Sequence, residues 1–494
     1  MKLGCVSCLD DKHDDCYSDD CPCLLETNHG RIIYDSSKET DHVFSLGKHG
    51  DGGIIDLVSK SLIEKYNFVT AIESDTILLF TGKIYENKKA LAIIKEETEK
   101  KIIDCTERDC LEVISKIKRS TYKDLKDFDS DPNLINLENG ILDLQTMKVK
   151  PHTPTYLSKI LIPCNYHEPR TTDIEVNLQN TLFWKFLNAS FTVDEKLNEE
   201  NVKTVLEIMA SVFIKKPTDE RAFIMWGEGE NGKSVLLDYI SYLLGKDNIS
   251  NIPLQELTSD KFAVANLDGK HANIFSDLEK NEFKQTSKFR ALASGEPVYA
   301  QFKNKQGFDL HPFSSLIFST NRFPKVYGDN KQGFFRRWII IKWLRNFEND
   351  PQRDSKLKKK LLENPTDRDT VFSNLIHISR RLYNSNKFSY SKDWKENQKT
   401  WNENADPVKN FIENYTIEVE NHSESKRETH NFYKEICDEL GETPLGMKQF
   451  SSAMSEYYDD SKSQGTRTWN HMKLKRPVQE SLKEYENTES ERDT

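Results

Sequence analysis

The chain has 494 residues, a formal net charge of −10 and a hydrophobic fraction of 36%. Its length allows two or three domains with separate cores, whereas no apolar run approaches the roughly 18 residues that crossing a bilayer requires. The acidic composition argues against non-specific coating of nucleic acid, and the N-terminus lacks the apolar core of a signal peptide, so we expect a cytoplasmic location without a membrane partner.

Cysteine and histidine are concentrated at the N-terminus. In a reducing compartment such a cluster points to a metal before disulfides. Cysteines at x-x spacing can meet on one tetrahedral Zn²⁺, which takes four ligands. We therefore expect a zinc-binding head in residues 1–30, with a free acidic tail as the alternative. The candidate ligands are Cys5, Cys8, His13, Cys16, Cys21, Cys23 and His29.

Residues 31–175 alternate short apolar runs with a charged, helix-like stretch at 86–105, which indicates a mixed α+β region. Within it, "FDSDP" places Asp129 and Asp131 close together, a pair that could hold the metals of a polymerase site. Such a pair normally ends an apolar strand, and the preceding "TYKDLKDF" is too polar for one. We therefore predict no primase site here.

Four short apolar runs in residues 176–350 have the composition of strands buried on both faces of a parallel sheet: "AFIMWG", "NIFSDL", "SLIFST" and "RWIIIKW". Between the first two lies "KSVLLDYISYLLG", whose apolar residues recur at helical spacing and whose Gly245 can end the helix. A strand, a glycine-rich turn, a helix and a second strand are therefore expected in that order.

The turn itself, "GEGENGKS", fits the spacing G-x-x-x-x-G-K-[ST] of a phosphate-binding loop. Backbone N–H groups hold the phosphates in such a loop, so the acidic side chains can point outward. Lys233 is placed to reach the β- and γ-phosphates, and the Ser234 hydroxyl can ligate Mg²⁺. The alternative is an idle turn. We expect an ATP site formed by Gly227, Glu228, Gly229, Glu230, Asn231, Gly232, Lys233 and Ser234.

Residues with the remaining chemistry of an ATPase adjoin the other strands of this region. One strand leads into Asp277, with Glu279 shortly after it, and either carboxylate could polarise the attacking water while Asp277 holds Mg²⁺. The next strand ends in Asn321, which can sense the γ-phosphate. Arg336 and Arg337 precede the fourth strand, where the γ-phosphate of a neighbouring subunit would balance their charge. The alternative for the arginines is a surface ion pair.

These motifs together resemble the superfamily 3 helicases, in the branch found in poxvirus, phage and plasmid primase-helicases. The resemblance covers about residues 130–345 and implies an AAA+-like core that forms a hexameric ring, with ATP at subunit interfaces and one of the two arginines acting in trans. Family members often carry a second acid where Ser276 precedes Asp277, so the roles of Asp277 and Glu279 stay open. The residues that carry the resemblance are "DPNLINLENGILDLQT", "PHTPTYLSKILIPCNY", "GEGENGKS", "GKHANIFSDLEK", "KFRALASGEPV", "LIFSTNRFP" and "GFFRRWIIIKW".

The segment "EPVYAQFKNKQGFDLHPF" has two alternating arms around a polar tip, which predicts a β-hairpin. Its tip carries Lys303 and Lys305. In related helicases an equivalent hairpin grips the DNA backbone inside the ring, so the resemblance makes these lysines candidate DNA contacts. The alternative is an ordinary exposed hairpin with solubilising lysines.

Polar helices are expected in residues 351–405, followed by a compact piece in which "DPVKNFIENY" opens with an Asp N-cap and a proline at the first helical position. Two further helical stretches and the basic strand "RTWNHMKLK" give the order of a winged helix, which often binds DNA. A packing role is the alternative. The Glu-rich C-terminal residues are typical of a disordered tail.

The sequence thus predicts an α/β protein with an AAA+-like phosphate-loop ATPase core. Its expected regions are a zinc-binding head (1–30), a mixed α+β pre-helicase domain (31–175), the ATPase domain with a helical collar at its start (176–350), a helical connector (351–405), a winged-helix-like domain (406–476) and a tail (477–494).

We expect an ATP-dependent superfamily 3 DNA helicase that uses Mg²⁺ and acts in the replication of a virus, plasmid or integrated element. Its expected partners are single-stranded or forked DNA, further copies of itself in a hexamer, and a separate primase or polymerase. The alternative is a DNA-binding replication initiator or regulator that ATP switches and that does not unwind DNA.

Overall fold

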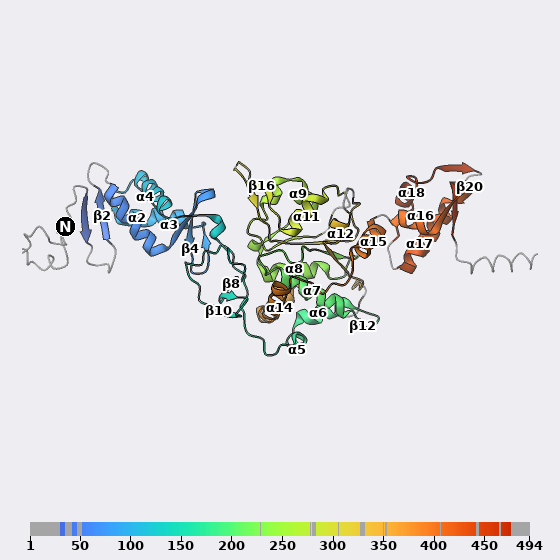
Figure 1. Cartoon of the computed structure of the whole chain (residues 1–494), viewed down its shortest axis with the longest axis horizontal. Coiled ribbons are helices and arrows are strands. Elements are labelled where there is room, and N and C mark those ends of the chain that lie inside the picture. The colour runs from blue at the N-terminus through green and yellow to red at the C-terminus, as the bar shows by residue number, and fades with distance from the viewer. Residues whose placement is uncertain are drawn as a thin grey trace, which may run out of the picture.

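The computed structural model describes residues 30–34, 42–46, 52–227, 229–276, 278, 283–304, 306–326, 331–348, 350, 353–405, 407–440, 444–463 and 466–475. The predicted zinc head, apart from its last residue, and the predicted tail lie outside these residues. Figure 1 shows the chain laid out along one axis, from the blue N-terminal part through the green and yellow central part to the red C-terminal part. Each part buries apolar residues of its own.

The N-terminal part packs helices beside two small sheets, with strand orders β5-β4-β3-β7 and β1-β2-β6. The helix predicted within residues 86–105 is confirmed as α3, and α4 opens with a capping box in which the Thr106 hydroxyl accepts a hydrogen bond from the backbone N–H of Asp109. The elements are β1 (Gly30–Tyr34), β2 (His42–Leu46), α2 (Gly52–Tyr66), β3 (Phe68–Ala71), β4 (Thr76–Phe80), β5 (Tyr85–Glu86), α3 (Ala90–Lys101), β6 (Ile102–Ile103), α4 (Glu107–Ser120) and β7 (Tyr122–Lys123).

The central part is built on a sheet whose described strands are all parallel, in the order β14-β15-β18-β13-β19. The four strands predicted from apolar runs are confirmed, and the short β14 adds an edge that the sequence did not reveal. Every residue of β13 is buried, as expected for a strand covered on both faces. The strands are β13 (Ala222–Trp226), β14 (Ile249–Ser250), β15 (Ala272–Phe275), β18 (Ser315–Thr320) and β19 (Trp338–Lys342).

Helices cover both faces of this sheet, because successive residues of β13 belong to two different cores: Phe223 and Met225 to one, Ile224 and Trp226 to the other. Figure 1 shows α7, α8 and α14 on one side of the strands and α9 and α11 on the other. The first side contains α5 (Ile174–Leu178), α6 (Leu182–Phe191), β11 (Thr192–Val193), β12 (Lys196–Leu197), α7 (Glu199–Ser211), α8 (Lys233–Leu244), α13 (Leu357–Leu362) and α14 (Pro365–Ser385). The second contains α9 (Leu254–Ser259), α10 (Lys261–Ala265), α11 (Thr286–Ser294), β16 (Val298–Gln301), β17 (Gly307–Leu310), α12 (Lys331–Phe335) and α15 (Trp394–Ala405).

Two predicted domain boundaries do not coincide with breaks in the core. The hairpin strands β8 (Leu134–Leu137), β9 (Gly140–Asp143) and β10 (Lys148–Lys150) fall in the predicted pre-helicase domain, yet Leu142 packs into the same core as α8. Likewise, the predicted connector supplies α14, whose Phe372 belongs to that core and whose helix packs on α7. The face of the sheet on which α8 packs is therefore also covered by segments that precede and follow the predicted ATPase domain.

The C-terminal part combines helices with an antiparallel sheet of order β20-β22-β21. The three predicted helices and the basic strand are present, whereas β20 and β21 were not predicted, because their many polar residues hide the strand pattern. The elements are α16 (Pro407–Tyr415), β20 (Thr416–Ser425), α17 (Lys426–Leu440), α18 (Met447–Met454), β21 (Asp460–Ser463) and β22 (Thr466–Leu474). Among all the helices in the described part of the chain, none is long and apolar enough to cross a membrane.

Candidate nucleotide site

Residues 227–234 join the carboxyl end of β13 to the first turn of α8. Gly232 precedes the helix with φ +92°, and a Cβ there would lie 3.1 Å from Phe186 Cε2 and 3.3 Å from Ser190 Oγ. Glycine is required at this position, because any other side chain would be both strained and crowded. The backbone N–H groups that open α8 have no partner within the helix and carry its partial positive charge, so the loop suits an anion.

Lys233, the first residue of α8, is only 7% exposed. Its Nζ donates to the backbone O of Gly227 at 2.5 Å, to Asn231 Oδ1 at 3.2 Å and to Asn321 Oδ1 at 3.2 Å. Asn321 directly follows β18, the neighbour of β13 in the sheet. The fold thus brings together two predicted site residues that are 88 positions apart in the chain.

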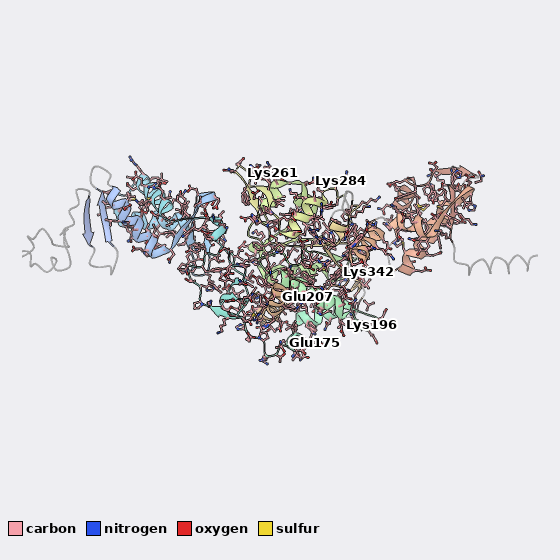
Figure 2. The ribbon with its side chains drawn as sticks, in the orientation of Figure 1. Glu175, Lys196, Glu207, Lys261, Lys284 and Lys342 are labelled. Carbon is pink, nitrogen blue, oxygen red and sulfur yellow. The ribbon has the colours of Figure 1, made fainter. Side chains whose placement is uncertain are left out.

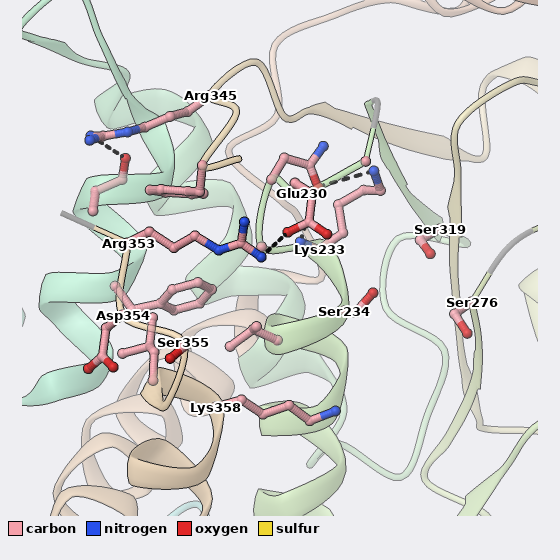
Figure 3. A pocket seen from close by; sticks show the side chains of 18 of the residues that line it. Glu230, Lys233, Ser234, Ser276, Ser319, Arg345, Arg353, Asp354, Ser355 and Lys358 are labelled. Atoms are coloured by element: carbon pink, nitrogen blue, oxygen red, sulfur yellow. Dashed lines mark hydrogen bonds and ion pairs between the residues drawn. The ribbon is translucent and has the colours of Figure 1, made fainter. Parts of the chain in front are cut away.

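A cavity of about 690 Å³ opens beside this pair, a volume within the range of sites for nucleotide-sized ligands. Ser234, Ser276 and Asn321 line it, as Figure 3 shows for the two serines. Its other wall comes from α6 and from residues 345–358, which supply apolar side chains such as Phe347. The arrangement can hold a phosphate chain at one end and an apolar ring system at the other.

Arg353 is a residue of this cavity that the sequence analysis missed. Its guanidinium donates to Glu230 Oε2 at 2.8 Å (Figure 3). Glu230, one of the residues predicted to form the ATP site, lines the cavity, and Arg353 offsets its charge. No local signal could have revealed the pair, because its members are 123 residues apart.

The segment that carries Arg353 is attached to the helices around it. Arg345 donates to the backbone O of Ala189 in α6 at 3.1 Å and pairs with Asp350 at 2.5 Å. Lys358, in α13, pairs with Asp238 of α8 at 2.5 Å. The backbone N–H of Phe347 also donates to the carbonyl of Glu230 at 2.8 Å, so the segment contacts the loop directly.

Some predicted site residues lie outside the described residues, namely Glu228, Asp277, Glu279 and Lys305. So do the seven predicted zinc ligands, and the zinc site stays a prediction. Within the parts of the chain that the structure covers, no three His, Cys, Asp or Glu side chains are grouped so as to hold a metal ion.

The two arginines before β19 have different surroundings. Arg336 is about half exposed and donates to Glu220 Oε2 at 2.8 Å. Arg337 is buried and donates to the backbone O of Gly333 and to Ser294 Oγ, both at 2.7 Å. Burial and the neighbouring Arg336 lower the pKa of Arg337. Arg337 therefore supports local packing, whereas Arg336 is available at the surface.

Both arginines lie far from the loop at residues 227–234 of their own chain. In the parallel pairing, Trp338 at the start of β19 lies opposite Ala222 at the start of β13, whereas the loop follows the end of β13. Five strand residues separate these two edges, a distance of about 16 Å at 3.3 Å per residue.

Asp129 and Asp131 are each engaged in local bonds. The Asp129 carboxylate accepts from Ser158 Oγ at 2.5 Å and from the backbone N–H of Lys159 at 2.9 Å, and burial raises its pKa. Asp131 accepts from the backbone N–H of Asn133 at 2.8 Å. These bonds hold turns of the chain in place.

The predicted hairpin is present as β16 and β17, with Val298 opposite Leu310 and with Lys303 exposed in the connecting turn. Beside it, a cavity of about 530 Å³ is lined by Lys261, Lys288, Phe262 and Tyr299, together with Ser259, Asp260 and Val298. Burial lowers the pKa of Lys288. Phe262 and Tyr299 are 41% and 54% exposed, and Lys261 Nζ lies 5.2 and 5.8 Å from their ring centroids.

This cavity lies at the edge of the central part, since Lys261 projects there next to β16 (Figures 1 and 2). Exposed aromatic rings among lysines form the kind of surface on which bases stack while the cations meet phosphates.

Three segments of the chain match known families. Residues 52–192 match "D5 N terminal like", residues 225–337 match "Family of unknown function (DUF5906)", and residues 403–493 match "Poxvirus D5 protein-like". The middle match contains the loop, Asn321 and both arginines.

Viral proteins are among the relatives of the chain. It is 21% identical over 316 residues to "Putative helicase L207/L206" of Acanthamoeba polyphaga mimivirus, covering 60% of this chain and 32% of the relative. It is 20% identical over 359 residues to "Putative primase C962R" of African swine fever virus, covering 68% of this chain and 34% of the relative. The chain thus spans about a third of the length of these relatives.

Among solved structures, the C-terminal region of NrS-1 aligns with a TM-score of 0.46 and 14% identity, over 84% of this chain and 98% of that one. The D5-like matches at both ends and the viral relatives agree with the resemblance found in the motifs. The chain thus carries two segments of the primase-helicase family, one D5 N terminal-like and one poxvirus D5 protein-like, and its relatives include viral proteins.

Proposed function

We propose that this chain is an ATP-dependent DNA helicase of superfamily 3, which acts in viral or plasmid replication as a ring of identical subunits. The observation that carries the proposal is the 3.2 Å contact between Lys233 and Asn321 at the edge of a nucleotide-sized cavity. It joins a phosphate-binding cation to a polar group that can sense the γ-phosphate.

The described residues have separate roles in the proposed hydrolysis. The loop and the first turn of α8 bind the phosphates through backbone N–H groups, and Lys233 offsets the charge of the β- and γ-phosphates. Asn321 orients the γ-phosphate or the attacking water. Mg²⁺, when bound by Ser234 and Asp277, would neutralise further phosphate charge, and Asp277 or Glu279 would accept the proton of the water.

A ring is supported by the position of Arg336. This exposed side chain lies at the edge of the sheet opposite its own loop, so it cannot serve the nucleotide of the same chain. A neighbouring subunit that places its cavity against this edge would receive Arg336 as the cation that stabilises the transferred phosphoryl group. Release from Glu220 would accompany that contact.

DNA as a partner is supported by the hairpin surface, defined by Lys261, Phe262, Lys288, Tyr299 and Lys303. The C-terminal part, with its winged-helix-like order of elements, is a second candidate contact. Two of the viral relatives are named as a helicase and a primase, which agrees with an enzyme that acts on nucleic acid.

Strand separation on a forked DNA duplex tests the proposal. The wild-type chain should separate the strands with ATP and Mg²⁺, and neither with ADP nor with a non-hydrolysable analogue. Lys233→Ala should abolish both hydrolysis and separation, because it removes a phosphate-binding cation. Lys246→Ala is the matched control, since this exposed lysine follows the opposite end of α8.

Wild-type hydrolysis rates in Lys233→Ala would refute the assignment of the site. Hydrolysis and tight DNA binding without strand separation would instead favour an initiator that ATP switches.

A further inference from the structure

Trp401 lies in a stretch of α15 that falls between the family matches at 225–337 and 403–493. Its indole is fully buried, at the centre of the core that covers the second face of the sheet. It contacts two segments that the proposed reaction uses, although these segments adjoin β18 and β19, strands that β13 separates in the sheet.

The first contact is with the turn that follows Asn321. Trp401 Nε1 donates to the backbone O of Pro324 at 2.8 Å. Its ring centroid lies 4.5 Å from that of Phe323. Trp401 thus contacts the turn that follows Asn321, and the Asn321 side chain accepts a hydrogen bond from Lys233.

The second contact is with the segment that carries the arginines. The ring of Trp401 lies 5.4 Å from Phe334 and 5.3 Å from Trp338, on either side of Arg336 in the sequence. One helical turn earlier, Asn397 Nδ2 donates to the backbone O of Trp338 at 2.7 Å. The same face of α15 thus holds both ends of the arginine segment.

The same helix connects directly to the C-terminal part. It ends at Ala405, and α16 begins at Pro407, with Val408 already in the C-terminal core. A displacement of the Asn321 turn or of the arginine segment would therefore move α15 and, with it, the start of the C-terminal part.

We propose that Trp401 is a positioning residue that couples Asn321 to the arginine segment and to the C-terminal part, so that both groups are aligned for hydrolysis together. This inference rests on the proposed ATPase function and assigns to α15 a role in transmitting the nucleotide state. Trp401 acts on catalysis through Asn321 and does not touch the nucleotide itself.

Kinetics of conservative variants test this role. Trp401→Phe keeps an aromatic ring and deletes the N–H that holds Pro324, so kcat for ATP should fall about tenfold because a small misplacement of a catalytic group is costly. KM for ATP should stay within about twofold, since the loop is unchanged. Trp394→Phe, the same change at a partly buried position of the same helix, is the control and should leave kcat unchanged.

A double-mutant cycle separates positioning from general packing. If Trp401 acts through Asn321, then Asn321→Ala and the double variant with Trp401→Phe should have the same kcat. The Asn321 side chain that Trp401 positions is already absent from both variants. The coupling would be overturned if the double variant lost kcat by the product of the two single losses, or if Trp394→Phe lost as much kcat as Trp401→Phe. If Trp401→Phe does not fold, Phe323→Leu tests the same contact from the other side.

The outcomes of the two proposals can be told apart. If the wild-type chain hydrolyses ATP and Trp401→Phe has the same kcat, only the coupling is overturned. A wild-type chain that hydrolyses no nucleotide overturns the proposed function and this inference with it.

Discussion

Glu230 places a carboxylate on the wall of a cavity that suits a polyanion, and Arg353 offsets this charge. The pair is about half exposed, so its intrinsic stability is small. Its importance lies in what remains when one partner is removed, because a lone carboxylate would face the phosphates at short range.

Arg353→Ala should therefore raise KM for ATP about three- to fivefold, which corresponds to about 1 kcal/mol, with kcat changing less. Adding Glu230→Gln to this variant should restore KM, because the repulsive charge is then gone as well. Steady-state kinetics at low salt measure both effects. Arg108→Ala, which breaks an exposed ion pair in α4, is the control. A double variant with the KM of Arg353→Ala alone would show that Glu230 does not matter to binding.

Residue-level prediction from the sequence succeeded where spacing carries the chemistry. The loop spacing and the ends of apolar runs identified Lys233 and Asn321, which lie together in the fold. Arg353 and Trp401 could not be found in this way, because each meets its partners only through the packing of distant segments.

Strands β13, β15, β18 and β19 of the central sheet were predictable as elements, because they are largely buried on both faces and their sequences are unbroken apolar runs. The polar β20 gave no such signal, since most of its residues are exposed or half-buried. The residues that α14 and the β8–β9 hairpin bury belong to a core that extends across the boundaries predicted for the ATPase domain, and a composition change along the sequence does not reveal such a shared core.

The hairpin surface leads to a prediction about salt dependence. Replacing Lys261 and Lys303 with Ala should weaken binding of single-stranded DNA and lower the slope of log Kd against log salt by about 1.4, if each lysine neutralises one phosphate. Basal ATPase should persist, because neither lysine lines the nucleotide cavity. Fluorescence titration at several salt concentrations measures the slope, with the Lys246→Ala and Lys270→Ala double variant as the control. An unchanged slope would return these lysines to an ordinary solvated role.

The packing of α3 on α2 contains a buried carboxylate that predicts a pH dependence. Burial alone would raise the pKa of Glu97, but hydrogen bonds from Lys65 at 2.9 Å and Lys100 at 3.1 Å outweigh it and lower the pKa to about 2. Because this value lies below the ordinary one, the ionised form stabilises the fold above about pH 4.3, and this stability is lost as the pH falls toward 2.

Glu97→Gln should accordingly lower the free energy of unfolding by about 1–3 kcal/mol at pH 6, with a difference that shrinks as the pH falls through 4 and 3. Denaturant unfolding of the wild-type protein and of Glu97→Gln at each pH measures this difference in the free energy of unfolding. Glu99→Gln, on the same helix, should show little difference at any pH. A difference independent of pH would mean that packing, and not charge, stabilises this contact.

At the scale of the whole molecule, the two arginines make different predictions. Arg336→Ala should bind ATP but hydrolyse it poorly, and mixing it with Lys233→Ala protein should recover part of the activity, because intact interfaces can then form. Arg337→Ala should instead lower thermal stability, since it removes bonds to Gly333 and Ser294. ATPase assays over a range of mixing ratios measure the recovery. No recovery at any ratio, despite proven co-assembly, would argue against action in trans.

The loop and Arg336 lie at opposite edges of the sheet, and this separation predicts how activity depends on protein concentration. If Arg336 acts in trans as proposed, a solitary chain has an incomplete reaction centre, so turnover per chain should rise with total protein concentration and then level off. Dilution should therefore lower the ATPase activity per chain. DNA that binds several chains close together would then activate hydrolysis by raising their effective concentration. Chains that are not bound to DNA would hydrolyse little ATP.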